Sequence, residues 1–531
     1  MNWLIQKGEV YDGTGAPARR ADVLVRDGVI AQIAPGIQAA DAQTVDASGC
    51  AVTPGFIDSH RHCDFAALTD EAFGKAELAQ GITTVVGGNC GLSAVPLRQA
   101  AAAAEAFVAP CLGPATATRY DSASAYMQAL SHQPLRLHMG MLAGLGAIRV
   151  AVKGFAKSPF SRQEMDAATG LVREGLDAGM LGLSMGVMYP PECYNTDDEY
   201  VSLLRAASPY GRPVCCHIRG EGDSLVSSVR ETIDWGRRAG MPVHISHFKC
   251  TGLKNWRDGI FRAIDVIEQA RQSGQDVTVD VYPYAAGATT LLSLLPPSVL
   301  DEDNDRLWDK LGTSAGVEEV RTALSHSHPG WDDMIASIGW KRIKISSGIP
   351  GEAFDCVNHD LEEIAEGLGL NGPVEAMCAL LHRTRGNVGV VLESMDPQDV
   401  DDVARLPYSF FISDALYGEG ASHPRRWGAF SRVIRDLVMD RGVLSLPEAI
   451  RKMTSLPAMR LGIANRGVLK QGMQADINIF DPAMVADRAT YANPAQHSTG
   501  MKLILVDGQP VWNSNGEVAS LCAGRAIRAS R

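Results

Sequence analysis

The sequence lacks the features that mark membrane and exported proteins. No stretch of 18 apolar residues occurs, so we expect no membrane-spanning segment. The first nine residues, Met1–Glu9, have no basic region followed by an apolar core, and they therefore do not resemble a signal peptide. These absences favour a cytoplasmic protein.

The sequence also lacks a disulfide framework and an excess of positive charge. Its eleven cysteines are scattered, no C-x-x-C pair occurs, and the adjacent Cys215 and Cys216 could not easily bridge each other. An odd number of cysteines without a framework indicates a reducing compartment. The formal net charge of −12 argues against nucleic acid or an anionic membrane as a partner.

The central part of the chain alternates apolar runs with segments of helical periodicity. Its 531 residues, 46% of them hydrophobic, are enough for a large α/β barrel with an accessory domain. The expected strands are 52–57, 82–86, 137–142, 181–184, 213–217, 243–246, 277–281 and 408–413, and the expected helices include 71–80, 162–178, 225–239, 257–273 and 426–440. Eight strands joined by crossover helices predict a closed (β/α)₈ barrel of the TIM type. The alternative is an open doubly wound sheet, but no G-x-G-x-x-G or Walker pattern opens a βα unit.

The two ends of the chain have the pattern of β-structure. Residues 1–50 and 464–531 hold short strand-like runs separated by glycines, and Asp507-Gly508 is a hairpin signal. Each piece is too small for a secure core, so we expect both to pair into one β-sandwich beside a barrel at 51–463. The stretch from about 285 to 407 is too long for a loop and is interpreted as an inserted subdomain before the last strand, covering the barrel mouth. The alternative is an insertion with no part in catalysis.

A pair of histidines follows the first expected barrel strand. His60 and His62 end the run Pro-Gly-Phe-Ile-Asp-Ser-His-Arg-His. Residues i and i+2 of a strand point to the same face, so both imidazoles can reach one metal ion. The alternative is a hydrogen-bonded rim at the strand end.

Further metal-binding side chains follow other expected strands. Cys90, His217, His247 and Asp414 each lie at or just beyond a strand end, where barrel enzymes carry their active sites. Six such donors on one rim are difficult to explain by packing alone. His244 is a rival to His247, because residues three apart on a strand face opposite ways and the spacing does not choose between them.

The motifs resemble those of a known family. Gly55-Phe-Ile-Asp-x-His60-x-His62 is similar to the opening signature of the amidohydrolase superfamily. Other motifs resemble one branch, the N-acyl-D-amino-acid deacylases (D-aminoacylases), and the resemblance runs nearly end to end. They are Gly81-Ile-Thr-Thr-Val-x-Gly-x-Asn-Cys90-Gly, Leu181-Gly-Leu-Ser-x-Gly, His217-Ile-Arg-x-Glu-Gly-Asp, Ile245-Ser-His247-x-Lys249, Asp280-Val-Tyr282-Pro-Tyr, Ser413-Asp414, His423-Pro-Arg425 and Lys452-Met-Thr-Ser-Leu-Pro-Ala.

The resemblance implies a binuclear type of metal site and an amidase activity. His60, His62 and Asp414 would form one metal position, while Cys90, His217 and His247 would form the tighter one, so the resemblance selects His247 over His244. These donors favour Zn²⁺, one ion tightly bound with room for a second. The reaction would be hydrolysis of the amide bond of N-acyl-D-amino acids, with Asp414 as general base toward water and then proton donor to the amine. The alternatives are a hydrolase of cyclic amides, like hydantoinases, and a non-catalytic metal-binding scaffold.

The substrate implied is a small molecule with a carboxylate. The residues that resemble the family's carboxylate-binding side chains are Lys249, Tyr282 and Arg425. Arg425 could instead pair with an acidic residue of the scaffold. Tyr189 could line the pocket or serve packing. Relatives often have serine in place of Ala288 and histidine in place of Leu145, so a more apolar pocket is expected. The preference for D over L substrates follows from the resemblance alone.

Overall fold

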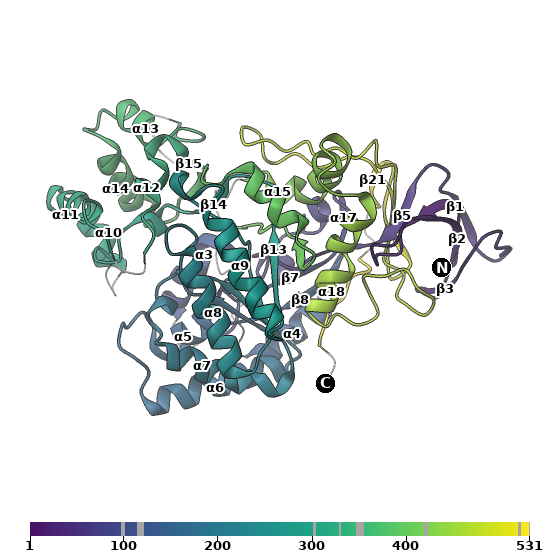
Figure 1. The fold of residues 1–531 in the computed structure, drawn as a ribbon, viewed down its shortest axis with the longest axis horizontal. Helices are drawn as coiled ribbons and strands as arrows, with labels where there is room; N and C mark the ends of the chain where they lie inside the picture. The colour runs from purple at the N-terminus through teal and green to yellow at the C-terminus, as the bar shows by residue number, and fades with distance from the viewer. Residues whose placement is uncertain are drawn as a thin grey trace.

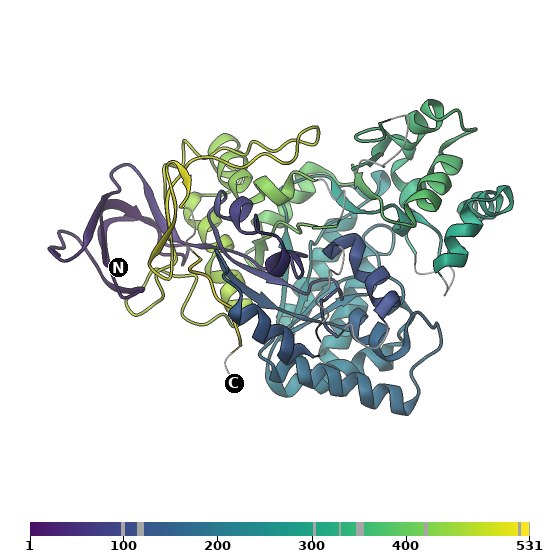
Figure 2. The same cartoon turned by 180° about the vertical axis from the view of Figure 1, so that it is seen from behind.

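The computed structural model describes residues 1–96, 101–113, 120, 122–300, 304–328, 331–346, 355–418, 423–518 and 522–529. Three parts of these residues are distinguished by their sheets: a central barrel, a sheet built from both ends of the chain, and an insert (Figure 1). The terminal sheet and the insert lie at opposite ends of the molecule with the barrel between them, as the reverse view also shows (Figure 2). No helix in the described ranges has both the length and the apolar character needed to cross a membrane.

The barrel consists of parallel strands, as the sequence predicts. They are β6 (Phe56–Asp58), β7 (Ile82–Gly87), β8 (His138–Met141) with β9 (Ala143–Gly144), β10 (Leu183–Gly186), β11 (Val214–His217), β12 (Val243–Ile245), β13 (Val277–Val281) and β17 (Ser409–Phe411). Neighbouring strands are paired from β6 to β8 and from β9 to β17. The residues just after β17 and β6 close the ring, because the Asp414 amide donates to the His60 carbonyl at 3.0 Å and the His62 amide to the Ala415 carbonyl at 2.9 Å. The predicted (β/α)₈ barrel is confirmed.

Helices surround the strands, and their bounds follow the sequence pattern with one exception. They are α1 (Ala66–Thr69), α2 (Lys75–Leu78), α3 (Ala101–Leu112), α4 (Ala123–His132), α5 (Leu145–Lys153), α6 (Arg162–Asp177), α7 (Asp197–Ala207), α8 (Leu225–Ala239), α9 (Gly259–Gln272), α15 (Pro397–Arg405), α16 (Arg425–Arg432) continued by a π-helix (Val433–Asp440), α17 (Leu446–Met453) and α18 (Ser455–Arg460). The helix predicted at 71–80 is a single turn, α2. Gly74 and Gly81 bracket it with positive φ angles of 98° and 82°, which interrupt a right-handed helix at both ends.

One seam of the barrel is completed by residues near the C-terminus. β8 and β10 are not paired directly, and the segment 524–529, here called the tail, lies between them. The Met139 amide donates to the Arg525 carbonyl at 3.1 Å, and the Ile527 amide donates to the Met139 carbonyl at 2.7 Å. On the other side the Ala529 amide donates to the Gly179 carbonyl at 2.9 Å. The tail therefore supplies backbone partners that the strands themselves do not.

The two chain ends share one nine-stranded sheet. Its strands are β1 (Trp3–Val10), β2 (Arg19–Arg26), β3 (Val29–Ala34), β4 (Gln43–Asp46), β5 (Ala51–Pro54), β18 (Ile477–Phe480), β19 (Met501–Val506), β20 (Gln509–Asn513) and β21 (Gly516–Glu517). β5 joins the halves by pairing in parallel with β1 and antiparallel with β18. Apolar side chains of both halves pack into one core, so each half buries the other's apolar face.

The run predicted as one strand at 52–57 is divided between the sheet and the barrel. β5 ends at Pro54 and β6 begins at Phe56. Gly55 allows this transition, because a Cβ there would lie 2.1 Å from Thr83 Oγ1. The close approach of β7 thus requires glycine at the point where the chain leaves the sheet and enters the barrel.

The insert has its own core and a small antiparallel sheet. Its elements are β14 (Gly287–Thr290), α10 (Asn304–Leu311), α11 (Ser314–Leu324), α12 (Met334–Ile338), β15 (Ile343–Ile345), α13 (Leu361–Gly367), α14 (Pro373–Thr384) and β16 (Gly389–Leu392), with the strands in the order β14-β16-β15. Buried residues from 291 to 392 form a cluster separate from the barrel core. α15, which follows, packs on β13 and β17 and covers the barrel instead.

Candidate metal centre

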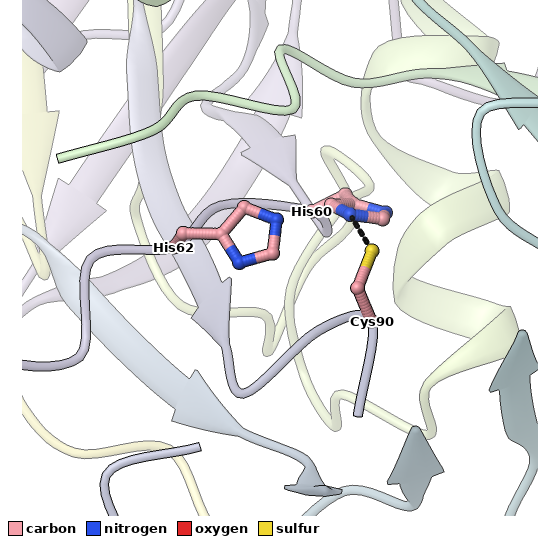
Figure 3. Close-up of side chains that lie close together, drawn as sticks. All are labelled: His60, His62 and Cys90. Atoms are coloured by element: carbon pink, nitrogen blue, oxygen red, sulfur yellow. Dashed lines mark hydrogen bonds between the residues drawn. The ribbon is translucent and has the colours of Figure 1, made fainter. Parts of the chain in front are cut away.

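The six predicted metal ligands converge at the carboxyl end of the barrel strands. His60 and His62 follow β6, Cys90 follows β7, His217 ends β11, His247 follows β12, and Asp414 follows β17. All six are buried. His60 Nε2 lies 3.3 Å from Cys90 Sγ, and Figure 3 shows His62 beside this pair. The barrel ends thus bring together side chains that are up to 354 positions apart in the sequence.

Cys90, His217 and His247 form a compact group. Their ligand atoms all lie within 4.8 Å of one another, and His247 Nε2 is 3.5 Å from Cys90 Sγ. His217 Nε2 is buried without a hydrogen-bond partner in the part of the chain that the structure describes. A buried imidazole nitrogen aimed at a thiol and a second imidazole fits a metal position, because buried polar atoms otherwise find partners. Two nitrogens and one sulfur suit zinc and leave a fourth position open.

His60, His62 and Asp414 form an adjoining group. Asp414 Oδ1 lies 3.4 Å from both His60 Nε2 and His62 Nε2. His60, His62 and Cys90 also have ligand atoms within 4.8 Å of one another. The two groups therefore meet at His60 and Cys90, as expected where two ions can share one cavity.

Three of these side chains sit on strained backbone. The φ angles of Cys90, His247 and Asp414 are 54°, 36° and 50°. A residue with a Cβ rarely adopts such left-handed angles, and each costs about 1–3 kcal/mol unless the surroundings impose it. The fold accepts this cost at three strand ends, and the result is that all three side chains turn toward the centre.

Burial favours the neutral forms of His62, His217 and Cys90. It lowers the pKa of His62 to about 4 and, together with the neighbouring His247, lowers the pKa of His217 well below its usual value. Burial raises the pKa of the Cys90 thiol well above its usual value. The lone pairs of these two imidazoles are therefore free for a metal at neutral pH, whereas the Cys90 thiol must lose a proton to bind one.

A second layer of carboxylates orients the histidines. Glu221 Oε1 lies 3.0 Å from His247 Nδ1, so Nδ1–H can donate to it and leave Nε2 free for a metal. Asp280 accepts from the His247 amide and lies 3.7 Å from His60 Nδ1. Neither Glu221 nor Asp280 was predicted to act at the site. The sequence does offer one sign of their role, because Glu221 lies in the motif of His217 and Asp280 lies in the motif of Tyr282.

His244 does not join the centre. Its Nε2 is 2.7 Å from Asp280 Oδ2 and its Nδ1 is 2.8 Å from Thr278 Oγ1, so both ring nitrogens have partners. Its ring also stacks on Phe410. The open choice between two histidines three positions apart is thereby resolved in the structure, since His247 is the one that faces Cys90.

The four predicted substrate residues all line the cavity beside this centre, but two of them are already paired. Lys249 Nζ is 2.5 Å from Glu221 Oε1, and Arg425 Nη1 is 2.9 Å from Asp414 Oδ2. The Arg425 guanidinium also lies over the Tyr282 ring, 4.8 Å from its centroid. The Tyr282 hydroxyl is buried without a hydrogen-bond partner among the described residues, while the Tyr189 hydroxyl is 3.5 Å from His217 Nδ1. A substrate carboxylate would therefore share Arg425 with Asp414.

The pairing with Arg425 affects the charge of Asp414. Burial alone raises the pKa of this carboxyl, but the Arg425 charge and the hydrogen bond with His62 outweigh burial and hold it well below its usual range. Asp414 is consequently a carboxylate at neutral pH, which is the form that can accept a proton.

The cavity has a volume of about 730 Å³ and lies between the barrel mouth and the insert. From the barrel it is lined by candidate ligands and by Leu92, Met188 and Leu416; from the insert it is lined by residues that include Ala288, Leu294, Asp332 and Met334. Ala288 thus lines the cavity as expected. Leu145 does not, because it begins α5 and is fully buried, so the expectation that it makes the cavity more apolar is wrong.

Comparisons with known proteins agree with this geometry. A model described as the amidohydrolase family matches residues 43–109 and 407–512. Three relatives from Alcaligenes xylosoxydans xylosoxydans each align over 96% of this chain: a D-aminoacylase (33% identical, 94% of its length covered), an N-acyl-D-aspartate deacylase (33%, 92%) and an N-acyl-D-glutamate deacylase (31%, 94%).

Solved structures agree as well. The crystal structure of N-acyl-D-glutamate deacylase from Bordetella bronchiseptica, complexed with zinc and a phosphonate mimic of the tetrahedral intermediate, is 31% identical. It covers 99% of both chains with a TM-score of 0.84. An L-hydantoinase from Arthrobacter aurescens is 15% identical with a TM-score of 0.53, a likeness of fold alone.

Proposed function

The chain belongs to the amidohydrolase family, in the branch of the N-acyl-D-amino-acid deacylases, and from that premise we propose that it hydrolyses the amide bond of N-acyl-D-amino acids with the help of zinc. The products are a carboxylate and a free D-amino acid. The observation that carries this proposal is the convergence of six buried nitrogen, sulfur and oxygen donors at one barrel mouth. A purely structural cluster has no need of an orphaned imidazole nitrogen and three strained donors.

Cys90, His217 and His247 would hold the tighter ion, and His60, His62 and Asp414 a second one. When bound, zinc supplies a Lewis acid that activates water and polarises the amide carbonyl. Asp414 accepts the proton that the attacking water loses and delivers it to the amide nitrogen as the C–N bond breaks, so a carboxylate and an amine leave. Its low pKa, held down by Arg425 against the effect of burial, keeps it unprotonated before the reaction.

Lys249, Arg425 and Tyr282 would bind the α-carboxylate of the substrate. The guanidinium offers two parallel donors, the ammonium a point charge and the phenol a single hydrogen bond. These groups fix the distance between the carboxylate and the scissile amide, while Tyr189 and the insert close the cavity around the rest of the molecule. Positioning of this kind converts binding energy into rate.

The substrate is a small molecule, and we propose no nucleic-acid or membrane partner, in keeping with the net charge of −12. We further propose the cytoplasm as the location. None of the described cysteines forms a disulfide, and a thiolate ligand such as Cys90 requires reducing conditions.

The test is an amine-release assay on zinc-loaded protein with a panel of N-acetyl-D- and N-acetyl-L-amino acids. Release of primary amine from D-substrates alone is expected, with loss of activity after chelation and after replacement of Cys90 by serine. Opening of a hydantoin without amine release would instead identify a cyclic-amide hydrolase. Bound zinc without hydrolysis of any amide would contradict the proposal and leave a metal-binding scaffold.

A further inference from the structure

The walls of the cavity differ between the metal side and the outer side. On the metal side the described lining residues carry charges, namely Glu221, Lys249, Asp414 and Arg425. The rest of the lining, here called the outer part, includes the uncharged polar residues Thr251, Thr289, Ser293 and Ser394 and the apolar residues Leu92, Met188, Leu294, Met334, Leu392 and Leu416. The acyl group and the amino-acid side chain of a substrate must both occupy the outer part, because the α-carboxylate and the scissile amide belong at the metal side.

Each of the two cationic side chains on the metal side is already paired with one carboxylate. Lys249 is paired with Glu221 at 2.5 Å, and Arg425 is paired with Asp414 at 2.9 Å. No other lysine or arginine lines this cavity in the part of the chain that the structure describes. The two cations can be shared with one α-carboxylate, but a second carboxylate on the substrate would find no counter-charge.

The remaining charged residue on the wall is an anion. Asp332 precedes α12 in the insert, and it accepts hydrogen bonds from the Gly222 amide at 2.8 Å, the Ser224 amide at 3.0 Å and the Ser224 hydroxyl at 3.0 Å. These bonds hold its carboxylate at the cavity edge and join the insert to the loop after β11. An acidic group entering the outer cavity would meet like charge there.

A cation nearby does not change this balance. Arg426 lines a neighbouring pocket, and its guanidinium lies over the rings of Tyr417 and Trp427, 3.9 and 4.8 Å from their centroids. Arg426 therefore packs on aromatic rings and does not line the cavity that includes Asp332 and Lys249.

We infer that the cavity selects substrates whose only negative charge is the α-carboxylate, so that both the side chain and the acyl group are uncharged. This inference rests on the proposed deacylase function and goes further by excluding acidic D-amino acids and dicarboxylic acyl groups. A buried carboxylate without a partner is strongly unfavourable, whereas neutral groups can use the apolar wall. Overall similarity does not decide the matter, because the D-aminoacylase, the N-acyl-D-aspartate deacylase and the N-acyl-D-glutamate deacylase are all 31–33% identical to this chain.

The experiment compares substrates that differ in charge and hardly in shape. Zinc-loaded protein is assayed on N-acetyl-D-glutamine and N-acetyl-D-glutamate, and on N-acetyl-D-leucine and N-succinyl-D-leucine. We expect kcat/KM to be about 100-fold or more higher for the neutral member of each pair. Dissociation constants of the products D-glutamine and D-glutamate, measured by titration calorimetry, give the same comparison without turnover.

The outcomes separate the two claims. Equal or faster hydrolysis of the acidic members would overturn the inference and leave the deacylase function standing. Hydrolysis of none of the four substrates by zinc-loaded protein would overturn the function itself.

Two variants test the residues that carry the inference. Asp332→Asn is expected to raise kcat/KM for N-acetyl-D-glutamate at least about 5-fold and to leave N-acetyl-D-glutamine nearly unchanged, because it removes the like charge. Met188→Lys adds a cation at a half-buried lining position and is expected to raise the glutamate rate further. Asp333→Asn is the matched control, since Asp333 caps α12 and does not line the cavity. An unchanged glutamate-to-glutamine ratio in both folded variants would overturn the charge argument.

Discussion

Replacing Glu221 with glutamine tests whether the carboxylate behind His247 sets the affinity for zinc. One oxygen of Glu221 serves two partners, His247 Nδ1 at 3.0 Å and Lys249 Nζ at 2.5 Å. A glutamine keeps the size of the side chain but removes its charge and one of its two acceptor oxygens. His247 then loses the anion that favours an Nδ1–H donor, and Lys249 loses its counter-ion.

The size of the effect follows from these contacts. Removing the carboxylate partner of a metal-bound histidine lowers metal affinity about 10- to 100-fold, which corresponds to about 1.4–2.8 kcal/mol. The side chains of Glu221 and Lys249 are only 9% and 11% exposed, so breaking the pair should also cost the metal-free protein about 3–5 kcal/mol of unfolding free energy. Burial lowers the pKa of Lys249, and the charge of Glu221 raises it again. Without that charge Lys249 can release its proton more easily, which reduces the loss of unfolding free energy.

The assay is a competition titration between the protein and a chromophoric chelator at constant pH, accompanied by chemical denaturation of the metal-free protein. Glu231→Gln is the control, because Glu231 lies on α8, is paired with Arg219 and does not line the cavity. A zinc affinity of Glu221→Gln within twofold of the wild type would refute the role assigned to this carboxylate.

Three further results are expected. Zinc affinity should rise about tenfold per pH unit between pH 6 and 8. Burial raises the pKa of the Cys90 thiol, so zinc binding releases one proton from it, whereas His217 and His247, with lowered pKa values, release none. An affinity that does not change with pH in the chelator titration would contradict this expectation. Arg425→Lys should raise KM about tenfold or more, because a lysine ammonium cannot make the two parallel hydrogen bonds that a guanidinium makes to a carboxylate. Steady-state kinetics on an N-acetyl-D-amino acid would show an unchanged KM if Arg425 only supports the scaffold. Deletion of residues 524–531 should lower the unfolding free energy by about 4 kcal/mol, since four backbone hydrogen bonds worth about 1 kcal/mol each are lost. An unchanged denaturation midpoint would contradict the structural role of the tail.

Much of the barrel and the candidate centre could be predicted because both depend on local sequence signals. A buried strand is an apolar run of fixed length, and a functional residue in this fold follows directly after such a run. His60, Cys90 and Asp414 could be found in this way without knowing how the strands are ordered. The division at Gly55 could not, because it depends on the distance to Thr83 on the next strand.

The supporting residues depend on geometry that spacing does not encode. Glu221 reaches His247 across two loops, and Asp280 contacts histidines from two other strands. Leu145 was misplaced because the chain turns into a helix directly after the strand, so that Leu145 begins α5 and does not line the cavity. Strained backbone at the ligand positions is likewise invisible in the sequence, since cysteine, histidine and aspartate give no sign of positive φ.

The tail has a consequence for how the protein is made. β8 leaves the ribosome almost four hundred residues before residues 524–529, which complete its open seam. Until then one edge of β8 exposes unpaired amides and carbonyls, which can pair with a strand of another chain. The barrel of the nascent protein therefore stays open at this edge until residues 524–529 have been synthesised, and a bulky group attached directly after the tail would crowd the seam that these residues close.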